Sequence, residues 1–176
     1  MNSSFQGIYF DASQIVDKAA ALTAKEKDIQ PAMRKAITRT ARWASGELRR
    51  RSARKVRVTG RVIKGRMGLF LQVDKARVFF GMDPISLSRL NPKKTNSGIK
   101  AGPVTVPGGF FIPKAGKNVF TRVGKGRFPI EKAEGVHIEN EGQSAIDSIL
   151  PDLEPRIWNE FERELNWQRI KETRSR

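Results

Sequence analysis

The sequence predicts an α+β fold in which one antiparallel sheet packs against a long basic N-terminal helix and a long C-terminal helix. Two observations indicate the helices: apolar residues recur at three- and four-residue steps over residues 28–50 and again over 144–171. A third indicates the sheet, because the residues between them form short runs rich in Val, Ile, Leu and Phe, separated by glycine and proline. At 176 residues, the chain is long enough for a single domain over residues 1–176 with its own core.

The chain opens with a short strand and a helix. Phe5–Phe10, with the sequence FQGIYF, is typical of a strand. Asp11 and Ser13 are alternative N-caps for a helix that continues to Leu22 through an alanine-rich stretch.

A long amphipathic helix follows. Asp28 is its candidate N-cap, and we expect the helix to end between Arg50 and Lys55. Apolar and small residues fall within one arc of the helix: Ile29, Met33, Ala36, Ile37, Thr40, Ala44 and Leu48. The remaining surface is basic, and it is the candidate face for DNA or for an acidic partner: Arg34, Lys35, Arg39, Arg42, Arg49 and Arg50.

The period then changes from helical to extended. Three runs, Val56–Lys64, Met67–Val73 and Ala76–Met82, predict an antiparallel meander. The following stretch, Asp83–Gly102, carries Pro, Asn, Ser and Gly with scattered Lys. We expect a long, mobile central loop there.

Extended structure resumes before a final helix. Short strands are expected at Val104–Val106, Phe110–Ile112 and Val119–Val123. Helical spacing of apolar residues then predicts a helix over Ser144–Lys171. Two prolines near its beginning, Pro151 and Pro155, are expected to kink or restart it.

Charge is the most unusual feature of the composition. The chain has 34 Lys and Arg against 18 Asp and Glu, a net charge of +16. Residues 28–66 carry 13 basic and 2 acidic residues, residues 84–130 carry 9 basic and no acidic ones, and residues 131–176 carry 11 acidic and 7 basic ones. This asymmetry allows the basic part of one subunit to meet the acidic part of a neighbour, or a basic face to meet DNA. A solvated basic surface without a fixed partner is the simpler alternative.

Little in the sequence points to catalysis. Cysteine is absent and His137 is the single histidine, so neither a thiolate metal site nor a Cys nucleophile is available. Gly124-Lys125-Gly126 lacks the spacing of a phosphate-binding loop and is typical of a hairpin turn. We expect no enzyme activity, no cofactor and no bound metal. No apolar run approaches the roughly 20 residues that span a bilayer, so no membrane partner is expected either.

One segment carries a family resemblance. In Gly108–Gly135 an apolar cluster is followed by a basic hairpin and then by Phe128-Pro129-Ile130. Here the sequence resembles the minor tail protein Z family of long-tailed phages, together with the related neck and tail-completion proteins. The matching pieces occur in the family's order and precede a long C-terminal helix: Pro107–Ile112, Val119–Arg122 and Gly124–Ile130.

The resemblance implies a structural virion protein that assembles as a ring, expected to be a hexamer, at the head-proximal end of the tail. The implied partners are copies of itself and the tail tube, tail terminator or head-tail connector proteins, with assembly in the cytoplasm of the bacterial host. Surplus apolar surface also favours an interface in this segment. The candidate subunit-interface residues are Gly109, Phe110, Phe111, Ile112, Phe120, Arg122, Arg127, Phe128, Pro129 and Ile130. The alternative is that this segment is the core of the sheet.

A second functional hypothesis is a dedicated nucleic-acid-binding protein, in which the basic face of the long helix follows phosphates. Both hypotheses would hold together if the ring surrounds genomic DNA and its basic helix lines the lumen. No DNA- or RNA-reading motif is present in the sequence, and the acidic C-terminal part does not favour a simple DNA-binding protein.

Overall fold

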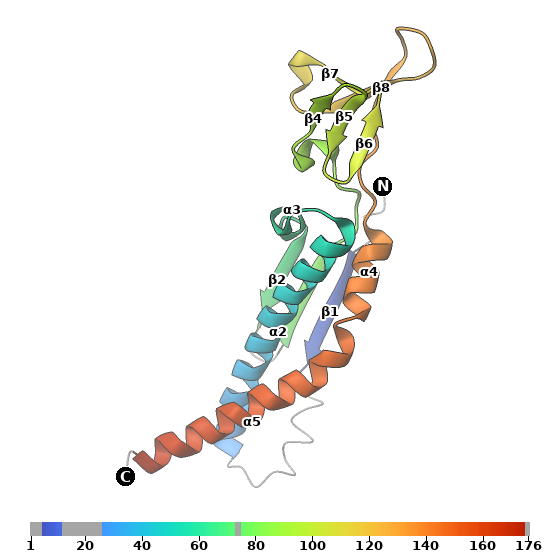
Figure 1. Cartoon of the computed structure of the whole chain (residues 1–176). Helices are drawn as coiled ribbons and strands as arrows, with labels where there is room; N and C mark the ends of the chain where they lie inside the picture. Colours follow the sequence, from blue (N-terminus) through green and yellow to red (C-terminus); the bar gives the residue numbers. More distant parts are fainter. Residues whose placement is uncertain (1–4, 12–25, 73–74, 175–176) are drawn as a thin grey trace.

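The computed structural model describes residues 5–11, 26–72 and 75–174 and shows an elongated α+β molecule (Figure 1). Its body contains the two long helices, α2 (Glu26–Val56) and α5 (Leu150–Arg174), which lie side by side. The predicted fold class, with a long helix towards each end of the chain, is confirmed. The predicted helix ending at Leu22 lies outside the described residues, apart from Asp11, which is the last residue of β1.

The sheet of the body has the strand order β1-β3-β2, all antiparallel. These strands are β1 (Phe5–Asp11), β2 (Met67–Leu71) and β3 (Lys75–Gly81). Successive side chains of a strand alternate between its faces, and the inward row supplies the core residues Ile8, Phe10, Val78 and Phe80. Helix α2 and the short helix α4 (Glu139–Asp147) cover this inner face. The core therefore lies between one layer of helices and one sheet.

The prediction of a strand at Val56–Lys64 is wrong. Arg57, with a φ of 58°, terminates α2, and a short helix α3 (Gly60–Lys64) follows. Val56 and Ile63 are both buried in this arrangement. The β-branched composition of the run favours a strand, but tertiary packing of these two side chains overrides that preference.

A second lobe is formed by residues 87–132, at the end of the molecule opposite the C-terminus of α5 (Figure 1). It contains two further three-stranded sheets, so the described residues form three antiparallel sheets where the sequence predicted one. The first sheet comprises β4 (Lys93–Thr95), β5 (Gly98–Ala101) and β6 (Val104–Pro107). The second comprises β7 (Phe110–Phe111), β8 (Val119–Arg122) and β9 (Ile130–Lys132). Two 3-10 turns complete the lobe, Leu87–Leu90 and Pro113–Ala115.

The first sheet corrects the expectation of a long loop over Asp83–Gly102. This stretch contains a 3-10 turn and the strands β4 and β5, and its apolar residues are buried: Leu87, Leu90, Ile99 and Ala101. The Asn and Gly residues that indicated a loop make tight turns, since Asn91, Gly98 and Gly102 all have positive φ. A Cβ at Gly98 would lie 2.1 Å from the Val106 carbonyl oxygen, so this glycine is required sterically as well.

Two chain segments join the lobes. Ile85 and Val136 form an antiparallel bridge, with N–H to carbonyl distances of 2.8 and 2.9 Å. Arg66, which follows α3, donates hydrogen bonds to the carbonyl oxygens of Asp83 at 2.8 Å and Pro84 at 2.6 Å. Burial, and secondarily the nearby charge of Arg89, lower the pKa of the Arg66 guanidinium. Arg66 and the Ile85–Val136 bridge thus both hold the connection.

The C-terminal helical region begins earlier than predicted and is divided in two. Helix α4 ends at Asp147, and α5 starts at Leu150, immediately before Pro151. The expected restart near the prolines is confirmed. A proline in the first turn lacks an N–H, but N–H groups at that position have no partner within the helix, so nothing is lost.

Candidate functional site

The predicted subunit-interface residues come together in the sheet β7-β8-β9 and the loop that joins its last two strands. Phe110 on β7 lies opposite Phe120 on β8, and their ring centroids are 6.4 Å apart. The guanidinium carbon of Arg122 lies 5.0 Å from the Phe110 ring centroid, in cation–π geometry. Residues 109–112 and Phe120 are all partly exposed.

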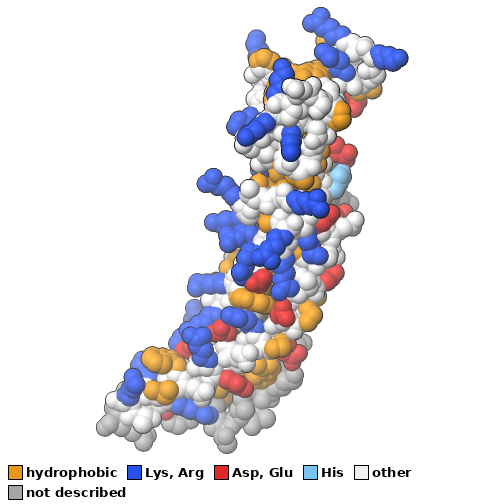
Figure 2. Space-filling model, in the orientation of Figure 1, with side chains coloured by type: hydrophobic (Ala, Val, Ile, Leu, Met, Phe, Trp, Pro, Cys, Tyr) orange, Lys and Arg blue, Asp and Glu red, His pale blue; other side chains and the backbone are white. Residues whose placement is uncertain are grey.

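The loop between β8 and β9 is the most exposed part of this sheet. All residues from 122 to 129 are exposed, and Phe128 keeps 69% of its surface accessible. The guanidinium carbon of Arg127 lies 6.0 Å from the Phe128 ring centroid, and the Val123 N–H donates to the Pro129 carbonyl oxygen at 2.9 Å to close the loop. Lys and Arg side chains gather at this end of the molecule (Figure 2). The loop therefore presents an aromatic ring and several cations to solvent.

This geometry bears on the two interpretations of the segment, core or interface. Only Val119 of β7, β8 and β9 is fully buried, and Phe111 packs partly against the core. The remaining apolar residues of these strands keep part of their surface in water. Val119 thus belongs to the core, while Phe110 and Phe120 keep part of their surface in water.

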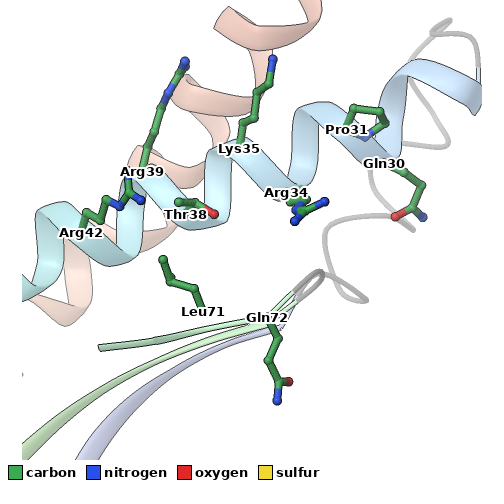
Figure 3. A pocket seen from close by; sticks show the side chains of 9 residues that line it. All are labelled: Gln30, Pro31, Arg34, Lys35, Thr38, Arg39, Arg42, Leu71 and Gln72. Carbon is green, nitrogen blue, oxygen red and sulfur yellow. The ribbon is translucent and has the colours of Figure 1, made fainter. Parts of the chain in front are cut away.

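The predicted basic face of α2 divides into two groups. Lys35 and Arg39 point towards α5 (Figure 3), where both pair with the buried carboxylate of Glu164. Arg39 also lies 3.5 Å from Glu160, while Arg50 pairs with Glu47 on its own helix. These three cations have acidic partners inside the molecule, so their first role is structural.

Three other arginines of the face, Arg34, Arg42 and Arg49, make no ion pair within residues 5–11, 26–72 and 75–174. They line a groove between α2 and strand β2. Figure 3 shows the part of it that Arg34 and Arg42 line. The groove consists of two adjoining hollows, of about 930 and 410 Å3, that share Arg42. Basic side chains extend along this side of the molecule (Figure 2). The groove therefore presents three arginines without an ion pair among the described residues.

Sequence reasoning missed an aromatic surface on the outer face of the body sheet. Tyr9, Arg77 and Phe70 are direct neighbours across β1, β3 and β2. Tyr9 is 69% and Phe70 61% exposed, and the Arg77 guanidinium carbon lies 4.8 Å from the Tyr9 ring centroid. A signal was present, because the consecutive apolar residues Ile8, Tyr9 and Phe10 cannot all face the same side of a strand.

Among the described residues, no three His, Cys, Asp or Glu side chains are grouped so that they could hold a metal ion. No helix in the described part of the chain is both long and apolar enough to cross a bilayer. His137 is exposed and lies 2.7 Å from Glu134.

Comparison of the chain with protein-family models, with curated proteins and with solved structures gives no match.

Proposed function

We propose that this protein is a non-enzymatic structural component of a long-tailed phage, a minor tail or tail-completion subunit that assembles as a ring at the head-proximal end of the tail. One observation carries the proposal. The sheet β7-β8-β9 lies at the far end of the second lobe and carries partly exposed aromatic residues and an exposed basic loop over residues 122–129. Projecting apolar surface of this kind marks an interface with another protein.

The proposed mechanism is insertion of the lobe into a neighbouring subunit. Phe110 and Phe120 would pack against apolar surface of the neighbour, while Arg122 and Arg127 would pair with its acidic groups. The first turn of α4 supplies such groups, since Glu139 is exposed and Glu141 is partly exposed. The basic charge of the second lobe and the acidic charge of residues 131–176 are complementary, which sets the register of the contact.

The proposed partners follow from this mechanism. Copies of the same chain would form the ring, expected to be a hexamer, and its outer faces would contact tail tube, terminator or connector proteins. The protein would be assembled in the cytoplasm of the bacterial host and retained in the virion.

The test is a double substitution, Phe110→Ala with Phe111→Ala, examined by light scattering and by incorporation into purified particles. We expect loss of ring formation and of incorporation, with a circular dichroism spectrum like that of the unchanged protein. Phe70→Ala is the matched control, because it removes an exposed aromatic ring in the body rather than in the second lobe. If the double variant fails to fold, the segment is core and the proposed mechanism is wrong.

A second candidate function, a nucleic-acid-binding protein, is favoured by the row of Arg34, Arg42 and Arg49, which have no ion pair with other described residues. Binding through phosphate contacts weakens steeply as salt rises. Tight binding of random duplex DNA by the monomer near physiological salt would favour this second function. Absence of such binding would favour the assembly component.

A further inference from the structure

We propose that the free edge of strand β2 and the arginine row of α2 form one docking site, at which an extended acidic segment of a partner protein adds to the body sheet as a fourth strand. This inference goes beyond the proposed function and does not depend on it. The docking site is defined by Arg34, Arg42 and Arg49 on α2 and by Met67, Leu69 and Leu71 on β2.

The backbone groups of β2 point alternately towards β3 and away from it. The Gln72 N–H donates to the Lys75 carbonyl oxygen, and the Gly81 N–H donates to the Arg66 carbonyl oxygen, both at 2.8 Å. In an antiparallel pair, alternate residues turn both backbone groups towards the partner strand. Residues 66, 68, 70 and 72 therefore face β3.

The intervening residues Met67, Leu69 and Leu71 turn their N–H and carbonyl groups the other way. Because β2 is the last strand in the order β1-β3-β2, that direction has no neighbouring strand among the described residues. A free edge of this kind is a template for pairing with another chain. Main-chain hydrogen bonds to such an edge supply affinity in complexes formed by strand addition.

The charge of the groove favours an acidic occupant. The two hollows of the groove are lined by cations on the α2 side and by Met67, Leu69 and Leu71 with their neighbours on the β2 side. Among the described residues, no carboxylate lines either hollow. A strand laid beside β2 would have one set of side chains directed towards α2. Acidic residues in that set would meet arginines that pair with no other described residue.

Spacing supports the same arrangement. At about 1.5 Å per helical residue, Arg34, Arg42 and Arg49 follow one another at intervals of roughly 10–12 Å and lie within one arc of about 80°. Alternate side chains of a strand are about 7 Å apart. Flexible arginine side chains can thus reach acidic residues placed at every second position of the added strand.

The groove also leaves room on the α2 side. Gly46 lies in the wall between Arg42 and Arg49, and a Cβ built at this glycine would meet nothing within 4 Å. On the opposite face of the sheet, the added strand would extend the exposed surface that contains Phe70 and Tyr9. An occupant with acidic residues on one face and β-forming residues on the other fits both environments.

Duplex DNA is the competing occupant of the arginine row. It would pair its phosphates with Arg34, Arg42 and Arg49 but would form no ladder with the backbone of β2. The two occupants therefore differ in whether the amides of Met67, Leu69 and Leu71 become protected.

The experiment uses the full-length protein and a fluorescein-labelled peptide of alternating threonine and glutamate. Its matched control is the same peptide N-methylated at alternate amides, which removes the hydrogen-bond donors of one edge and leaves the charge unchanged. We expect binding of the first peptide by fluorescence anisotropy, weakening by about tenfold or more with the second. Hydrogen exchange at Met67, Leu69 and Leu71 should slow when the first peptide is bound.

Protein variants test the charge. Arg34→Glu combined with Arg42→Glu should weaken peptide binding by about tenfold or more. Lys114→Glu combined with Lys117→Glu is the control, because it makes the same charge change at exposed residues of the second lobe. It should alter binding by less than about twofold, since those charges are distant from the groove.

The proposal is overturned if the acidic peptide does not bind, or if N-methylation leaves its affinity unchanged. It is also overturned if duplex DNA displaces the peptide while the three amides exchange freely throughout. The N-methylated peptide leaves the protein unaltered, so this arm remains decisive even if the charge-reversed variant does not fold.

Discussion

The guanidinium of Arg39 on α2 lies 3.1 Å from the carboxylate of Glu164 on α5, whose side chain is only 3% exposed. Lys35 pairs with the same carboxylate, and Glu160 lies beside it, 3.5 Å from Arg39. The cations keep about half of their surface in water, whereas the carboxylates do not. This asymmetry determines how the contact between the two long helices responds to substitution.

Removing the two cations should cost more stability than removing the acid. Lys35→Met with Arg39→Met leaves Glu164 and Glu160 buried without those counter-charges, and we expect a loss of about 3–5 kcal/mol. Glu164→Gln leaves half-exposed cations that can turn towards water, and we expect about 1–2 kcal/mol. Urea unfolding of the three proteins measures the difference. A greater loss of unfolding free energy for Glu164→Gln than for the double variant would contradict this expectation. It would show that the charge of the carboxylate contributes more to stability than its burial costs.

Two glycines should respond to alanine in opposite directions. In Gly142→Ala, the new Cβ would lie 2.6 Å from both the Met82 sulfur and the Phe80 ring, so overpacking should cost about 1–3 kcal/mol. In Gly46→Ala, the Cβ meets nothing within 4 Å, and the better helix former in α2 should add about 0.5–1 kcal/mol. Thermal denaturation of both variants checks the pair. Equal shifts of the melting temperature in the two variants would mean that α4 moves away from the sheet to accept the methyl group added at Gly142.

The long helices could be predicted from sequence because their burial follows their periodicity. Ile29, Met33 and Ile37 repeat at the helical step and are all buried. The second lobe could not be predicted in the same way. Its core residues, Leu87 and Ile99 among them, are separated by turn-forming residues, and no regular step connects them. Composition indicated a loop where turns join very short strands.

The candidate site was predictable only in part. The helical pattern identified a basic face of α2, but the division of that face depends on α5, more than a hundred residues away in the chain. Lys35 and Arg39 meet Glu164 there, while Arg34 and Arg42 point to the groove. Periodicity gives the direction of a side chain and not the identity of its neighbour.

Arg66 should control the stiffness of the connection between the lobes. Arg66→Ala removes both hydrogen bonds to the Asp83 and Pro84 carbonyl oxygens and should cost about 2–3 kcal/mol, because each bond has a charged donor. We also expect faster cleavage at residues 83–86 by proteinase K. Arg66→Lys is the control, since a lysine can retain one of the two bonds and should give an intermediate cleavage rate. Equal cleavage rates for all three proteins would show that the Ile85–Val136 bridge alone holds the connection.

Phe128 separates the requirements of folding from those of assembly. Its ring is 69% exposed, so Phe128→Ala should change the free energy of unfolding by no more than about 0.5 kcal/mol. Phe80→Ala removes a fully buried ring and should cost about 3–5 kcal/mol, which calibrates the measurement. If the exposed loop inserts into a neighbouring subunit, Phe128→Ala should nevertheless reduce ring formation in analytical ultracentrifugation. The Phe128 ring is mostly exposed, so a loss of assembly in this variant would not come from a lost internal contact of comparable size. If Phe128→Ala assembles as well as the unchanged protein, the interface lies away from residues 122–129.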